Sequence, residues 1–172
     1  MDLYIGLAVG ILFGYGTTGF LVVPRLGKNN TARLGCILVA ASFALIIGSG
    51  LTGNPDALKG AMLLFGVAAG ITTIASISLM LDLTAAQTAG TFVGAWGLAQ
   101  SLSRGIAIAL GGQILDIGNF IFDSTWLAYS LVFFCEALCI IGAVILLNQV
   151  NVKEFQETTN KATTMIMEGD LD

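Results

Sequence analysis

The sequence predicts an all-α, polytopic membrane protein, and three features of its composition lead to this prediction. Hydrophobic residues make up 56% of the 172 residues, and charged residues only 10%. Soluble domains carry roughly 25% charged residues, so this chain has too few to cover a surface that faces water. Its mean hydropathy is +0.89. The chain also combines 22 glycines with 2 prolines, and glycines inside apolar runs are typical of packed transmembrane helices.

Five apolar stretches are long enough to cross about 30 Å of hydrocarbon as helices. Pro24 ends the first stretch, and a turn around Asn54 separates the second from the third. Asp82 interrupts the next pair, and residues 118–125 separate the last two. The predicted spans are residues 3–23, 34–51, 60–81, 90–115 and 126–150. Residues 1–150 therefore form one transmembrane helical bundle, and residues 151–172 form a polar, acidic tail.

Lysine and arginine residues predict the orientation of this bundle. The N-terminus lacks the positive segment of a signal peptide, so the first apolar stretch is interpreted as a span. Cytoplasmic loops carry the excess of positive charge. Alternating the spans places five cations on one side and only Lys59 on the other, which predicts an outer N-terminus and a cytoplasmic tail. The five are Arg25, Lys28, Arg33, Lys153 and Lys161.

The residue types that are missing exclude most catalytic chemistry. The chain has no histidine, and histidine is the usual general base and the commonest metal ligand. No nucleophile–base pair or phosphate-binding glycine loop is present, so we expect no catalytic residues, no metal site and no enzymatic step. The formal charge of -4 argues against binding nucleic acid. Cys36, Cys135 and Cys139 all lie in apolar stretches, where they are interpreted as small packing residues.

Glycines recur at intervals of four residues in several spans. The pattern covers Gly6, Gly10 and Gly14 in the first span, Gly66 and Gly70 in the third, and Gly90 and Gly94 in the fourth. Because lipid gives helices no hydrophobic reason to associate, small residues that allow close backbone approach supply the packing. The stripes predict contacts between helices of this chain, or alternatively a homodimer face.

Two charged residues, Arg104 and Glu136, lie at membrane depth. An ionisable group at a helix centre costs about 2.5–3.5 kcal/mol, so such groups persist when they are paired or functional. Arg104 lies ten residues before the outer end of its span, and Glu136 lies ten residues after the start of the next. Both are therefore about 15 Å deep. We expect a buried Arg104–Glu136 ion pair, shared with Gln100; the alternative is an Arg104 that lines a cavity.

Other polar and aromatic residues mark the ends of the predicted spans. Asp82 and Asp116 are placed at the ends of the third and fourth spans. Asp82 is expected to form a turn, and Thr84 to cap the following helix. Trp126 and Tyr129 begin the fifth span, where aromatic rings commonly anchor at the membrane interface.

The segments Ser78–Thr84 and Gly111–Asp116 flank Gly90–Gly105, which contains a Gly-Ala-Trp-Gly run. Together these three segments resemble the PucC-type family, the bacteriochlorophyll-delivery branch of the major facilitator superfamily. The resemblance implies that the spans correspond to spans 8–12 of a twelve-span facilitator. It also implies that Trp96, Gln100 and Arg104 line the central cavity, whereas Glu136 is a candidate on the depth argument alone.

The same resemblance implies a role in (bacterio)chlorophyll delivery or in the assembly of light-harvesting or photosystem complexes. Chlorophyll or bacteriochlorophyll would then be a ligand, with no covalent cofactor. The membrane would be a thylakoid or a bacterial inner or intracytoplasmic membrane. Without histidine, the pigment magnesium would need another ligand, such as Gln, Asn, a backbone carbonyl or water.

The resemblance also implies partners. A facilitator cavity lies between two halves of the fold, and five spans cannot form it. We therefore expect a fragment, one piece of a split protein, or a short relative that works with a partner. Besides membrane lipid, the expected partners are the missing N-terminal facilitator half or another membrane protein, and light-harvesting or photosystem subunits.

Two other functions remain open. The chain is alternatively a generic small-solute transporter of the same superfamily, which predicts transport in vesicles and no bound pigment. A third interpretation is a structural subunit of a photosynthetic membrane complex, which packs through its glycine faces.

Overall fold

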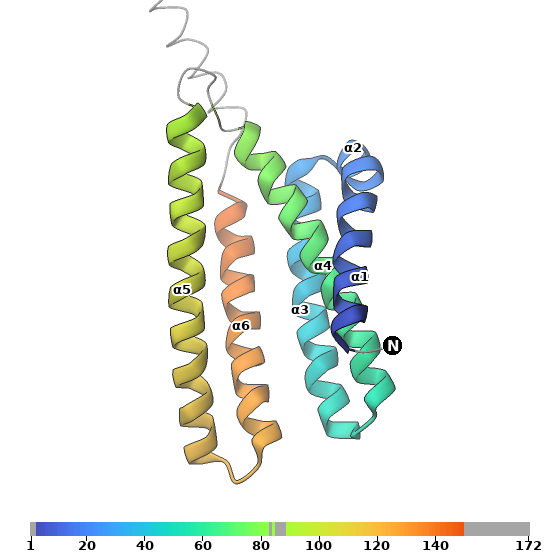
Figure 1. The fold of residues 1–172 in the computed structure, drawn as a ribbon, viewed down its shortest axis with the longest axis vertical. Helices are drawn as coiled ribbons and strands as arrows, with labels where there is room; N and C mark the ends of the chain where they lie inside the picture. The colour runs from blue at the N-terminus through green and yellow to red at the C-terminus, as the bar shows by residue number, and fades with distance from the viewer. Residues whose placement is uncertain (1–2, 83, 85–88, 150–172) are drawn as a thin grey trace, which may run out of the picture.

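A computed structural model describes residues 3–82, 84 and 89–149, and this part of the chain is helical, with no strand (Figure 1). The predicted all-α fold is therefore confirmed. The helices are α1 (Leu3–Thr17), the π-helix η1 (Thr18–Val22), α2 (Val23–Leu26), α3 (Lys28–Thr52), α4 (Pro55–Asp82), α5 (Ala89–Ile121) and α6 (Thr125–Leu147). The predicted tail, residues 151–172, lies outside the described residues.

Four helical segments are both long enough and apolar enough to span a membrane. They are Tyr4–Leu26, which joins α1, η1 and α2, together with Lys28–Thr52, Pro55–Asp82 and Thr125–Leu147. The fifth predicted span corresponds to α5, whose 33 residues give ample length. It lacks a sufficiently apolar stretch because Gln100, Arg104, Gln113 and Asp116 interrupt its apolar residues.

Helix boundaries differ from the predicted spans at several places, including the start of α4 at Pro55. Pro24 lies in the first turn of α2 rather than ending the helix, because the first turn tolerates its missing N–H. The reversal falls on Gly27, whose φ of 77° is in the left-handed region, so α3 already begins at Lys28. The helix α5 continues to Ile121, which places Asp116 inside the helix and not at its end.

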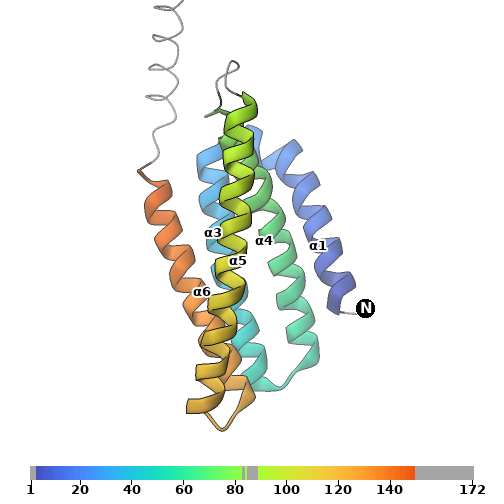
Figure 2. The same cartoon turned by 60° about the vertical axis from the view of Figure 1, so that its left-hand side comes forward.

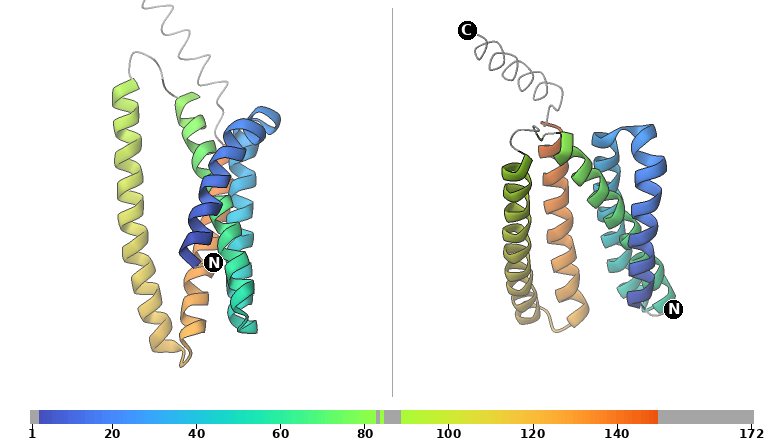
Figure 3. Two further views of the ribbon diagram at one scale, coloured as in Figure 1. Left: turned by 45° about the vertical axis from the view of Figure 1, so that its right-hand side comes forward. Right: turned by 45° about the horizontal axis from the view of Figure 1, so that its top comes forward.

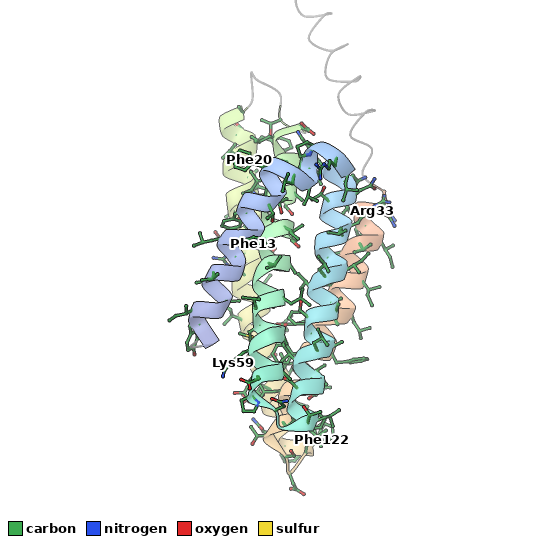
Figure 4. All side chains as sticks on the ribbon, turned by 90° about the vertical axis from the view of Figure 1, so that its right-hand side faces the viewer. Phe13, Phe20, Arg33, Lys59 and Phe122 are labelled. Carbon is green, nitrogen blue, oxygen red and sulfur yellow. The ribbon has the colours of Figure 1, made fainter. Side chains whose placement is uncertain are left out.

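The long helices run alternately up and down, as the predicted topology requires (Figure 1). The α2–α3 turn therefore lies at the same end of the bundle as the last turn of α6. Arg33 lies near this end, whereas Lys59 lies near the opposite one (Figure 4). Arg25, in α2, and Lys28, at the start of α3, lie at the same end as Arg33.

The helix α4 is the centre of the packing, with α1 on one side and α3 on the other. Helix α6 packs against α3, and α5 packs against α6. Figure 2 shows α1 and α6 on opposite sides of the bundle, and both views of Figure 3 show α5 at its outer edge. Phe13 and Phe20, on α1 and η1, are 63% and 85% exposed (Figure 4), so this side of the bundle is strongly apolar.

The α1–α4 contact is made by glycines from both helices. A Cβ on Gly10 would lie 2.6 Å from the carbonyl oxygen of Leu63, and one on Gly66 would lie 2.5 Å from that of Leu7. Gly14 and Gly70 meet in the same way one turn further along. The glycine stripes of the first and third spans therefore pack against each other within one chain, as predicted.

An ion pair joins the beginning of α3 to the end of α4. The Nζ atom of Lys28 lies 2.6 Å from Oδ1 of Asp82. A cation at a helix N-terminus and an anion at a C-terminus each oppose the helix dipole, and pairing them offsets that cost. Asp82 also lies in a turn, as predicted, because the N–H of Thr84 donates to the carbonyl oxygen of Leu81 at 3.2 Å. The hydroxyl of Thr84 donates to the carbonyl oxygen of Met80 at 2.7 Å, so it caps the end of α4. Its predicted capping of the following helix involves residues 85–88, which lie outside the described residues.

We predict that Gly66→Ala destabilises the protein while Gly60→Ala does not. Both residues lie on α4, but a Cβ on Gly60 meets nothing within 4 Å. At position 66 the new methyl would contact backbone of α1 that no side-chain rotation relieves, at a cost of about 1–3 kcal/mol. Thermal unfolding in detergent, followed by circular dichroism, measures the difference. Equal melting temperatures for the two variants would contradict the packing described above.

We predict measurable coupling between Lys28 and Asp82 in a double-mutant cycle with Lys28→Gln and Asp82→Asn. Both side chains are only about one-third exposed (37% and 29%), so the coupling should reach roughly 0.5–1 kcal/mol. The matched control is the Lys59–Asp56 pair, within the first turn of α4, whose Asp56 side chain is 86% exposed. That control should show no measurable coupling. Additive losses at Lys28 and Asp82 would show that their contact contributes nothing to stability.

Candidate functional site

A polar groove lies along one face of α5. Trp96, Gln100 and Arg104 follow one another at intervals of four residues, which places them on the same side of the helix. Together with Ala99 and Ser103 they line a hollow of about 380 Å³. The structure thus brings together three of the four residues expected to line a cavity. We call this hollow the α5 groove.

The α5 groove is rich in hydrogen-bond donors. The guanidinium of Arg104, the amide of Gln100 and the indole of Trp96 all carry N–H groups. The ion pairs of the described residues are Lys28–Asp82 and Lys59–Asp56, so none of these residues places a carboxylate against Arg104. The groove therefore offers its donors, including one positive charge, to whatever lies against α5.

Glu136 lines a different and larger hollow. It lies on α6, and it contributes to a cavity of about 790 Å³ between α3, α4, α5 and α6. We call this hollow the four-helix cavity. The predicted Arg104–Glu136 ion pair is absent, because each charge faces its own hollow. Ser103 lines both hollows, so the two hollows lie at a similar level along α5 but on different sides of it.

The walls of the four-helix cavity are mostly apolar. Phe43 and Phe65 lie on one side of it, with their ring centroids 5.4 Å apart. The polar atoms come from Glu136, from three hydroxyls and from two thiols. The remaining polar lining residues are Thr72, Thr73, Ser103, Cys135 and Cys139. The sequence analysis did not predict that Thr72 and Thr73 line a cavity. Two adjacent polar residues within an apolar helix were the feature that could have indicated it.

A third hollow, of about 470 Å³, lies where α6 begins beside the α3–α4 turn. The indole nitrogen of Trp126 donates to the carbonyl oxygen of Ile47 at 3.3 Å. The ring also occupies the position that a side chain on Gly50 would need. Trp126 therefore holds α6 against α3, in addition to its predicted place at the end of a span.

The described residues hold no group of three or more Cys, Asp or Glu side chains placed to bind a metal ion together. Cys36, Cys135 and Cys139 are free thiols. The α5 groove and the four-helix cavity both combine apolar walls with a few polar groups, as ligand-binding sites do.

Comparison with known proteins places the chain in a family. A family model described as PUCC protein matches residues 2–155. A relative from Rhodobacter capsulatus, described as an uncharacterized protein in the puhA-bchM intergenic region, is 24% identical over 112 residues. That match covers 65% of this chain but only 24% of the relative's length. No solved structure matches this chain. The apolar helices and the match to nearly all of the helical region show that this chain is an integral membrane protein of the PucC family.

Proposed function

We propose that this protein acts in photosynthetic membranes by delivering (bacterio)chlorophyll to light-harvesting or photosystem complexes, or by assisting their assembly. The observation that carries the proposal is the PucC family match over residues 2–155. The place of the relative's gene between puhA and bchM supports a role related to photosynthesis. The protein binds and transfers the pigment, and no enzymatic step is involved.

The geometry of the α5 groove supports binding of such a ligand. An arginine at the centre of a membrane helix costs about 2.5–3.5 kcal/mol on insertion scales. A ligand with carbonyl oxygens, such as the keto and ester groups of a chlorophyll, would accept hydrogen bonds from Arg104 and Gln100. The indole of Trp96 provides an aromatic surface beside them.

The exposure of α5 supports a partner that covers the groove. Most of its side chains are exposed, including Leu98 (62%) and Ile108 (72%). The chain spans about a quarter (24%) of the relative that it matches. We propose that the missing N-terminal half of a facilitator, or another membrane protein, packs over α5 and completes the site. Light-harvesting or photosystem subunits receive the pigment.

The distribution of positive charge supports an orientation. Arg25, Lys28 and Arg33 lie at one end of the bundle, and Lys59 lies at the other. With positive loops in the cytoplasm, the N-terminus lies outside and the C-terminus inside. The proposed location is a thylakoid membrane or a bacterial inner or intracytoplasmic membrane.

A second candidate function is transport of a small anionic solute, which the positive charge of Arg104 in the α5 groove favours.

A third candidate function is a purely structural role in a photosynthetic complex. The open glycines of α5 favour that role, because a Cβ on Gly90, Gly94 or Gly97 would meet nothing within 4 Å. These glycines therefore offer a face for another helix.

We predict that the protein, tagged at its native locus and purified in mild detergent, carries chlorophyll bands and antenna proteins. Arg104→Gln should weaken pigment binding in the α5 groove about tenfold and so lower the ratio of pigment to protein, because a hydrogen bond to a charged group contributes about 1.5–3 kcal/mol. Asp116→Asn is the matched control, since Asp116 lies on α5 but lines neither the α5 groove nor the four-helix cavity. An absorption spectrum beside an immunoblot measures the ratio.

The other candidates give different results in the same preparation. A colourless protein that exchanges anions in vesicles would replace pigment delivery with solute transport. Stoichiometric co-purification with a photosynthetic complex, even when pigment synthesis is blocked, would assign the structural role.

A further inference from the structure

The polar atoms of the four-helix cavity are nearly all hydrogen-bond acceptors. The hydroxyl of Thr72 donates to the carbonyl oxygen of Ala68 at 2.9 Å, and that of Thr73 to Ala69 at 2.8 Å. The hydroxyl of Ser103 donates to Ala99 at 2.7 Å. Because these protons are already used, the three hydroxyls offer only lone pairs to the cavity. The thiols of Cys135 and Cys139 are weak donors.

Glu136 adds a carboxylate to this acceptor-lined space. No Lys, Arg, Asn, Gln or Trp is among the residues that line the cavity. Among the described residues, Lys28 pairs with Asp82 and Lys59 pairs with Asp56. Neither lysine therefore balances the negative charge of Glu136. An ionised carboxylate at membrane depth is stabilised by an opposite charge or a strong electron-pair acceptor beside it. The cavity is therefore complementary to a lipophilic ligand with an electropositive centre.

The ligand class can be narrowed by the chemistry of the cavity. Its volume of about 790 Å³ is in the range of small-molecule sites. The rings of Phe43 and Phe65 provide aromatic wall against which a flat macrocycle packs. Magnesium is a hard cation that prefers oxygen ligands, and the chain contains no histidine to bind it in the usual way. A carboxylate is the strongest oxygen donor in this cavity.

We propose that the four-helix cavity binds a magnesium tetrapyrrole, with a carboxylate oxygen of Glu136 as the axial ligand of the magnesium. This inference rests on the proposed function, which supplies (bacterio)chlorophyll as the cargo. It adds a second site, separate from the α5 groove, and assigns the residue that distinguishes the metal-bearing pigment from its metal-free form.

The test compares chlorophyll a with pheophytin a, which has the same macrocycle without magnesium. The purified full chain in nanodiscs is titrated with each pigment, and quenching of tryptophan fluorescence reports the dissociation constant. Wild-type protein should bind chlorophyll a at least tenfold more tightly than pheophytin a. Resonance Raman bands sensitive to magnesium coordination provide a second measurement, which does not depend on affinity.

Two variants and a control isolate the role of Glu136. At the four-helix cavity, Glu136→Leu should weaken chlorophyll a binding at least tenfold, leave pheophytin a binding unchanged, and remove the Raman signature of the protein ligand. Glu136→Gln keeps an oxygen ligand and should fall between wild type and Glu136→Leu. The matched control is Asp116→Leu, which removes a carboxylate of α5 that lines neither hollow and should bind both pigments within twofold of wild type. Leucine suits a membrane helix, and circular dichroism verifies the fold.

Each contrary result has a separate meaning. If Glu136→Leu bound both pigments as wild type does, the axial-ligand assignment would be wrong and pigment delivery would stand. If wild type bound neither pigment, both proposals would fail. Binding of tetraphenylphosphonium that depends on Glu136, without a preference for chlorophyll a over pheophytin a, would replace the magnesium tetrapyrrole with a lipophilic organic cation.

Discussion

The close approach of α1 and α3 to α4 is the contact on which the rest of the structure depends. Gly66 and Gly70 let the backbone of α1 touch that of α4, and Gly35 lets α3 approach Thr72. Ala68 and Ala75, on α4, are fully buried. Lipid is as apolar as these side chains, so burial from water does not hold the helices together. Dense van der Waals contact through small residues does.

This three-helix unit positions α6, and α6 in turn positions α5. Trp126 bonds to α3 at one end, Phe133 stacks near Phe43 in the middle, and Leu147 packs against Ala32 and its neighbours at the other end. Helix α5 approaches α6 closely where Gly118 meets Ala128. Because α5 is held chiefly by α6, space remains between it and the α3–α4 pair. The four-helix cavity occupies that space.

The hollows on either side of Ser103 have opposite chemistry. The α5 groove presents donors from Arg104, Gln100 and Trp96, whereas the four-helix cavity presents acceptors around Glu136. A pairing of Arg104 with Glu136 would have neutralised both charges inside the protein. Their separation leaves each available for a ligand or a partner.

Composition and periodicity by themselves determined the helical membrane fold, the order of the spans and the glycine contacts between α1 and α4. These features follow from local properties, namely apolar length and the positions of small residues. The similar level of Arg104 and Glu136 along neighbouring helices was also predictable, because rise along a helix depends only on residue number. Which way each side chain faces depends on how the helices rotate against their neighbours. That rotation is set by contacts such as Gly118 with Ala128 and Trp126 with Gly50. Only the tertiary structure therefore decided that the two charges face different hollows, that Lys28 binds Asp82, and that the two threonines line a cavity.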